Sequence, residues 1–232
     1  MPERIAQYCL NHLPLKHATL SDEYFYLSLP FCVIDAVYSL GVKYSSTLNT
    51  VRRFCNAQGL ERLRPRDSSY PDKKEQYSIN QFEELFSRYD NNYEEVAVKL
   101  FGNRQRTSPK NGILKAEAVH KFTKILLLHH VNYFQDVPAV IQNMIFESDI
   151  KSIPGQTYGT SLKYFFMLAG EKNKIKPDRM IRRFLERIIN GDLKQQPPEK
   201  WLSQALQILN KTYPKLTLRE LDHEIWKYER SQ

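Results

Sequence analysis

The sequence predicts an all-α protein, and two observations carry this prediction. Apolar residues recur at helical spacing along most of the 232 residues, whereas the alternation typical of a half-buried strand is scarce. The chain also contains only 8 glycines, few for a protein built from many strands and tight turns. With 41% hydrophobic and 26% charged residues, the composition is that of a folded globular protein and excludes the disordered and collagen-like classes.

The first predicted helices precede a long polar loop. Glu3–Leu13 is a short amphipathic helix, and Pro30 opens a helix at Phe31–Leu40 that is apolar on almost every side, so we expect it to be buried. A more polar helix follows at Ser45–Gln58. The next segment, Leu60–Tyr77, is rich in Arg, Asp, Ser, Pro and Lys and is therefore predicted to be an exposed loop without an assigned partner.

The remaining helices are predicted from capping signals and apolar spacing. Ser78 and Gln81 form a capping-box pattern ahead of one helix, and Thr217 and Glu220 form another ahead of the last. Between them we expect helices at Tyr93–Phe101, Leu114–Val131, Val137–Phe146, about Thr157–Ala169, Asp178 to about Asn190, Pro198–Lys211 and Thr217–Arg230.

We expect these helices to form two lobes. At about 100–200 residues per domain, the length allows one large domain or two smaller lobes. Residues 30–147 are predicted to form a lobe like a six-helix barrel. Residues 1–29 and 148–232 are predicted to form a second helical lobe, with a hairpin at about 150–160.

The formal net charge of +8 is concentrated in one stretch. Between Lys151 and Asn190 there are nine cations and three carboxylates. A basic surface suits a polyanion, because neutralising phosphates and releasing counterions supplies most nonspecific affinity for nucleic acids. A solvated basic helix surface remains an alternative explanation.

The cysteines indicate a reducing, intracellular location. Cys9, Cys32 and Cys55 are widely spaced and fit no metal-binding spacing, so we expect reduced, mostly buried thiols. No apolar run approaches the ~18 residues of a membrane span, and the first residues show no signal-peptide pattern. We therefore expect no membrane partner and no metal.

The segment from Ile150 to Arg183 carries a family resemblance. The letters IPGQTYGTS place a Pro-Gly turn before one helix, and about twenty residues later KPDRMIRR places Asp178 at the start of the next. This pattern resembles the helix-hairpin-helix DNA glycosylase superfamily, with its LPGVG-like hairpin and VDTHVxR-like segment. The upstream segments LPFCVIDAVYSLG and NGILKAEAVHKF are similar to the family's first barrel helix and its KAE helix.

The resemblance implies a protein of base-excision repair that binds double-stranded, damaged DNA. In this family the hairpin N–H groups and a helix dipole hold a phosphate, and an Asp at the lobe cleft stabilises the sugar cation and activates water. Asp178 is then the candidate catalytic residue, with no cofactor. The candidate DNA-binding residues are Lys151, Pro154, Gly155, Gln156, Thr157, Tyr158, Gly159, Lys163, Arg179, Arg182 and Arg183.

Several departures from the family pattern narrow the function. Gly159 stands where bifunctional members carry a lysine nucleophile, so lyase activity is disfavoured. Thr157 replaces the second hairpin glycine, so the turn must differ or be strained. Three cysteines cannot supply four cluster ligands, which excludes an iron–sulfur cluster. Two functions remain open: a monofunctional DNA N-glycosylase, and a noncatalytic DNA-binding module on the same scaffold.

The candidate residues also have structural explanations. The Pro-Gly turn could simply join two helices, and Asp178 could serve as an N-cap. Lys163 fits a phosphate contact or solvent exposure better than a nucleophile. Near the end of the chain, Asp222, His223 and Trp226 fit packing and polar contacts better than a hydrolytic or metal site.

Overall fold

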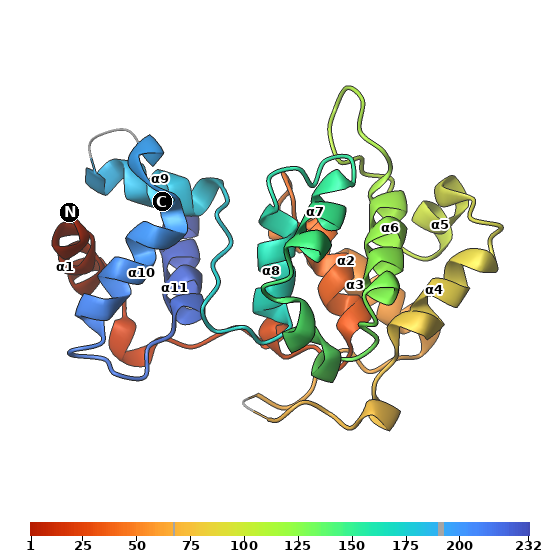
Figure 1. Ribbon diagram of the computed structural model, residues 1–232, viewed down its shortest axis with the longest axis horizontal. Helices are drawn as coiled ribbons and strands as arrows, with labels where there is room; N and C mark the ends of the chain where they lie inside the picture. Colours follow the sequence, from red (N-terminus) through yellow and green to blue (C-terminus); the bar gives the residue numbers. More distant parts are fainter. Residues whose placement is uncertain (67, 190–192) are drawn as a thin grey trace. The chain divides into compact units, whose positions relative to one another are not determined.

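The computed structural model describes residues 1–66, 68–189 and 193–232 (Figure 1). The prediction of an all-helical fold is confirmed, since these residues form helices and only two isolated β-bridges. The α-helices are α1 (Pro2–His12), α2 (Leu29–Tyr38), α3 (Tyr44–Gln58), α4 (Ile79–Ser87), α5 (Tyr93–Lys99), α6 (Lys115–Leu128), α7 (Met144–Ser152), α8 (Thr160–Leu168), α9 (Arg179–Ile189), α10 (Pro198–Leu209) and α11 (Leu218–Ser231).

The chain folds into two compact units that interleave in the sequence. The insert unit, Asp22–Ala169, contains α2 to α8, and the terminal unit combines Met1–Ser21 with Gly170–Gln232. The sequence placed the boundaries at 29/30 and 147/148 instead. Because α8 packs directly against α2, the hairpin between α7 and α8 groups with the insert unit.

Helix α2 forms the centre of the insert unit. All ten of its residues are buried, and it packs against α3, α4, α6 and α8 (Figure 1). Phe31 of this helix contacts Phe54 on α3, whose ring in turn meets Phe82 on α4. Burying each such side chain contributes about 1.5–3 kcal/mol, so an apolar α2 is what the core of this unit needs.

Lys115 joins two helix ends inside the insert unit. It is 1% exposed, and its ammonium group donates to the carbonyl oxygens of Tyr38 and Leu40, both at 2.8 Å, and to Gln105 Oε1 at 3.2 Å. The last carbonyl groups of a helix lack partners within the helix, and the helix dipole favours a cation there. Lys115 therefore connects the start of α6 to the end of α2.

The terminal unit is a small bundle of α1, α9, α10 and α11. Helix α1 packs against α9 and α10, and α9 packs against α11. Its core draws on every helix, with Ile5 and Cys9 from α1, Phe184 from α9, Leu202 from α10 and Ile225 from α11. No described helix in either unit has both the length and the apolar character required to cross a bilayer.

Two predicted elements differ in detail from the structure. Instead of a helix at Val137–Phe146, a 3-10 segment at Phe134–Val140 contains Pro138, and α7 starts afresh after Asn143. The Asn143 side chain accepts the N–H groups of Ile145 and Phe146, which fixes that start. The helix predicted to end at about Asn190 is described as far as Ile189, and Asn190 lies outside the described residues.

The loop at Leu60–Tyr77 is exposed only in part. Arg64 is 9% exposed, and its guanidinium lies 5.3–5.6 Å from the ring centres of Phe25, Tyr70 and Phe134. The Tyr70 hydroxyl donates to the carbonyl of Ala169 at 2.6 Å. Cation–π contacts and this hydrogen bond anchor the loop to its unit, while Asp67 lies outside the described residues.

Candidate nucleic-acid interface

The hairpin between α7 and α8 consists of two consecutive β-turns. Gln156 N–H donates to the carbonyl of Ile153 at 2.9 Å, and Gly159 N–H donates to the carbonyl of Gln156 at 2.8 Å. Pro154 and Gly155, with φ of +88° at Gly155, fit the second and third positions of a type II turn. The turn chemistry therefore follows directly from the Pro-Gly pair.

The turn around Thr157 does not need a glycine at that position. Thr157 has no positive φ, and the left-handed conformation falls on Gly159, with φ of +67°. Gly159 is the residue directly before α8, and a side-chain carbon there would lie 2.9 Å from Cε of Lys151. A glycine in the left-handed conformation is thus present two residues after Thr157.

The turn leaves backbone donors at the surface. Gly155, Thr157 and Tyr158 are exposed, and their N–H groups have no hydrogen-bond acceptor among the described residues. The α8 helix that follows has no side-chain N-cap, because Gly159 occupies that position. Free N–H groups and the positive end of a helix dipole together attract an anion.

The hairpin side chains divide between the surface and the interior. Tyr158 is 90% exposed, whereas Gln156 is 2% exposed and its amide oxygen accepts the Ser161 hydroxyl. Gln156 therefore offers a phosphate no exposed donor, because its side chain is buried and its N–H is bonded to Ile153, and this corrects its place among the candidate DNA-binding residues. Lys151 is half-buried and pairs with Glu147 at 2.5 Å, and Lys163 is half-buried on α8.

Asp178 caps the start of α9 in the terminal unit. Its Oδ1 accepts the N–H groups of Met180 at 2.8 Å and Ile181 at 3.4 Å. Oδ2 has no hydrogen-bond partner among the described residues, and the side chain is half-buried. The carboxylate is therefore held rigidly by one oxygen and offers the other.

The arginines of α9 follow its amphipathic pattern. Ile181, Phe184 and Leu185 are buried, whereas Arg179, Arg182, Arg183 and Arg187 are exposed. Arg187 lies 3.0 Å from the buried Glu229 carboxylate, and Arg183 lies 3.8 Å from it. Arg179 and Arg182 form no ion pair among the described residues, so no nearby carboxylate balances their charges.

Asp222 is a second carboxyl group in the same unit, and the sequence did not predict its link to Asp178. Asp222 is 4% exposed, and its Oδ1 accepts the N–H of Lys176 at 3.0 Å. Burial, and then the negative charge of Asp178, raise the pKa of Asp222 well above its usual range. Asp222 is thus electrostatically coupled to Asp178, which its sequence position 44 residues away does not indicate.

His223 and Trp226 pack together on α11. Their rings are nearly parallel with centres 5.7 Å apart. Burial, followed by the positive charge of Lys227, lowers the pKa of His223 to about 4. Within the described ranges, no three His, Cys, Asp or Glu side chains gather in a way that could hold a metal ion.

The candidate residues therefore form two groups, one in each unit. Lys151, Lys163 and the hairpin turn (residues 154–159) belong to the insert unit, and Asp178 with the arginines of α9 belongs to the terminal unit. Each group is defined by its own contacts.

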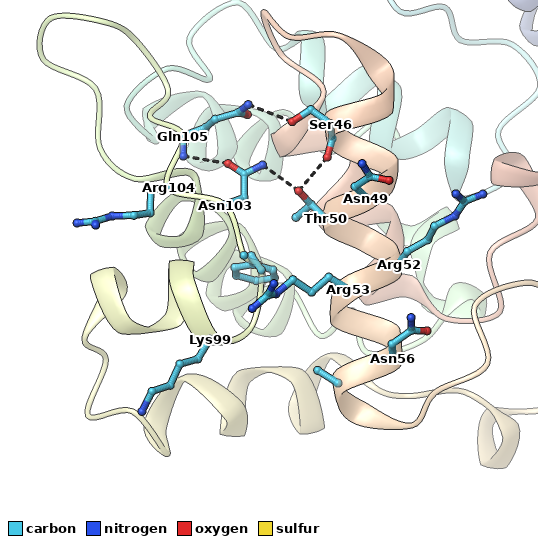
Figure 2. A pocket seen from close by; sticks show the side chains of 13 residues that line it. Ser46, Asn49, Thr50, Arg52, Arg53, Asn56, Lys99, Asn103, Arg104 and Gln105 are labelled. Carbon is cyan, nitrogen blue, oxygen red and sulfur yellow. Dashed lines mark hydrogen bonds between the residues drawn. The ribbon is translucent and has the colours of Figure 1, made fainter.

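A polar pocket in the insert unit was not among the sequence candidates. It has a volume of about 1150 Å³ and lies between α3 and the segment at 99–105 (Figure 2). Asn49, Arg52, Arg53 and Asn56 line it from α3. Their spacing of three and four residues on one polar helix face is the signal that could have revealed it.

The chain belongs to a protein family defined by a conserved domain. The family model described as a domain of unknown function, DUF8548, matches residues 3–230 and so covers both units. No curated protein and no solved structure matches the chain.

Proposed function

We propose that the protein binds duplex DNA through the α7–α8 hairpin and removes a base from it as a monofunctional N-glycosylase. The observation that carries DNA binding is the hairpin turn, where the N–H groups of Gly155, Thr157 and Tyr158 are unpaired at the surface. Backbone donors directly before a helix start suit a phosphate of any sequence context.

Two hairpin side chains support the same partner. Tyr158 presents a ring that is 90% exposed, and an exposed aromatic ring can stack on a base or pack against a sugar. The Lys151 stem lies over Gly159, which brings a cation to the turn. These contacts would add to backbone recognition without selecting a sequence.

Asp178 supports the catalytic part of the proposal. Its capping bonds use Oδ1, which leaves Oδ2 to orient a water molecule or to stabilise positive charge on the sugar. The half-buried position limits screening of that charge. In this scheme the bond from the sugar carbon to the base breaks and the base leaves with the electron pair. Water bonds to that carbon, Asp178 takes the water proton, and solvent returns a proton to the released base.

A noncatalytic DNA-binding module is the second candidate. The observation that favours it is the pair of capping bonds, which account for an Asp at this position without any chemistry. The two candidates share the hairpin and differ only in what Asp178 does.

The deciding experiment measures base release and DNA binding in the same samples. Duplexes carrying uracil, alkylated, oxidised or mismatched bases are incubated with the natural protein and with Asp178→Asn. Asparagine caps helices as well as aspartate does, so the variant keeps the fold and loses only the charge. We expect release to fall by about 10²–10⁴-fold and DNA affinity to stay equal or rise.

Each other outcome has a defined meaning. Release retained in Asp178→Asn contradicts the role given to Asp178. Tight binding without release from any duplex selects the noncatalytic module. Absence of DNA binding contradicts both candidates.

A further inference from the structure

The pocket beside α3 is polar and open, with a wall held by hydrogen bonds. The Asn103 side-chain N–H₂ donates to Thr50 Oγ1 at 2.8 Å, and that of Gln105 donates to Ser46 Oγ at 3.2 Å (Figure 2). Asn103 Oδ1 in turn accepts the N–H of Gln105 at 3.0 Å. These bonds fix the segment at 103–105 against α3 before any ligand arrives.

The charge of the pocket is one-sided. Arg52, Arg53, Lys99 and Arg104 line it, and none of the lining residues that the structure describes carries a carboxylate. Lys99 and Arg104 pair with Glu95 and Glu94 outside the lining. Arg52 and Arg53 form no ion pair in the described part of the chain, so their charges are uncompensated.

Arg53 is held in place across the pocket. Its guanidinium donates to the carbonyl of Val98 at 3.3 Å and passes directly over Gly102. A side-chain carbon at Gly102 would lie 2.4 Å from Cδ of Arg53, so only glycine leaves this path open. A positioned arginine beside exposed amides of Asn49 and Asn56 is suited to phosphate oxygens.

The pocket is linked to the hairpin by one short segment, because Gln105 lines the pocket and Thr107, two residues further on, touches the hairpin turn. A side-chain carbon at Gly155 would lie 2.4 Å from Cβ of Thr107, so the hairpin turn touches the loop that follows Gln105. From Ser46 to Asn56, α3 runs about 15 Å, and phosphates of one strand are spaced about 3.4 Å along a duplex axis. A strand held at the hairpin could thus present several successive phosphates to this helix face.

We infer that the pocket between α3 and residues 99–105 is a second DNA contact, which binds the phosphodiester backbone that continues from the hairpin. This inference rests on the proposed function, because it takes DNA as the partner of the hairpin. Arg52 and Arg53 supply the main charge–phosphate contacts, and Asn49 and Asn56 donate hydrogen bonds to neighbouring phosphates. Lys99 and Arg104 also line the pocket, but their charges are balanced by Glu95 and Glu94.

The test compares two charge-matched double variants of the full chain. Arg52→Gln with Arg53→Gln removes the uncompensated pocket charges, and Arg88→Gln with Lys124→Gln removes two exposed cations of the same unit outside the pocket. Binding of a fluorescent duplex is measured by anisotropy over a range of salt concentrations. We expect the pocket variant to bind about tenfold more weakly, with a salt slope smaller by about 2, and the control to change little.

The outcomes separate failure of this inference from failure of the proposed function. If the pocket variant binds like the natural protein while a hairpin variant, Gly155→Ala, loses binding, the pocket inference is overturned and the hairpin stands. If the natural protein binds no duplex, both are overturned. Binding of ADP that depends on Arg52 and Arg53, without any effect of these residues on DNA affinity, makes the occupant a free nucleotide and also overturns the inference.

Discussion

The starts of α8 and α9 solve one electrostatic problem in opposite ways. Each helix begins with N–H groups that have no partner within the helix. Asp178 satisfies those of α9 with its own carboxylate, whereas Gly159 brings no side chain to α8. Two N–H groups at the start of α9 are thus satisfied by a side chain, whereas the start of α8 has no side-chain cap.

The comparison teaches that a similar turn-to-helix pattern can serve two purposes. At α9 the Asp178 carboxylate is fixed by two capping bonds to Oδ1, and these bonds leave Oδ2 in a defined position. At α8 the left-handed glycine and the two β-turns expose backbone donors, which is a geometry for binding. In the proposed function, binding and chemistry therefore depend on different residues, and each can be tested by its own variant.

The largest expected effect on stability concerns the buried His223 of α11 and is seen in acid. The pKa of His223 is lowered from 6.5 to about 4, so the unfolded chain takes up the proton first as the pH falls. The stability that depends on neutral His223 is complete above pH 6.5 and is lost as the pH falls towards 4, by about 3 kcal/mol. Asp222 acts in the opposite direction, because its raised pKa gives stability that is present in acid and lost as the pH rises.

Urea unfolding of the natural protein and of His223→Gln between pH 7.5 and 4 isolates the histidine. We expect the stability difference between the two proteins to shift by about 3 kcal/mol in favour of the variant at low pH. His17→Gln, an exposed position, is the control. A difference that stays constant with pH would show that His223 does not titrate in this way.

The second prediction concerns the hairpin turn before α8. In Gly155→Ala the new side-chain carbon meets Thr107 at a backbone with φ of +88°, so the hairpin turn must change. We expect DNA affinity to fall about tenfold, which is about 1.4 kcal/mol. Gly59→Ala is the matched control, because Gly59 also has a positive φ of +64° but open space around it. Equal DNA affinities for the two variants would remove the hairpin from the binding surface.

The third prediction separates the capping hydrogen bonds of Asp178 from its charge, and its expected effect on stability is smaller than that of His223. Asp178→Ala removes both and is expected to lower the free energy of unfolding by about 0.5–2 kcal/mol, whereas Asp178→Asn keeps the cap and changes it little. Chemical denaturation of the three proteins measures the difference. If asparagine destabilises as much as alanine, the charge rather than the hydrogen bonds holds the start of α9.

The helical fold could be predicted because its signals are local. Apolar spacing located most helices. The capping box at Thr217 and Glu220 predicted the start of α11, where Thr217 is the observed N-cap. The unit boundary differed because it depends on packing between α2 and α8, which are more than a hundred residues apart in the sequence. Composition and periodicity contain no information on such pairings.

The candidate sites likewise divide into features set by local residue types and features set by the fold. The Pro-Gly turn and the Asp178 cap follow from local residue types, so the sequence indicated both. The coupling of Asp222 to Asp178 and the pocket between α3 and 99–105 require residues brought together by the fold. The sequence also did not predict that the Gln156 side chain is buried, because its position depends on the hydrogen bond with Ser161.

The interleaving of the two units has a consequence for synthesis on the ribosome. Helix α1 is made before the insert unit and its partners α9 and α10 after it, so α10 follows α1 by roughly 10–40 s at about 5–20 residues per second. Until α9 and α10 are made, the apolar face of α1, which includes Cys9, has no native helix to cover it. Burial in the finished unit raises the pKa of the Cys9 thiol to about 12, so folding of α9 and α10 onto α1 keeps this thiol protonated.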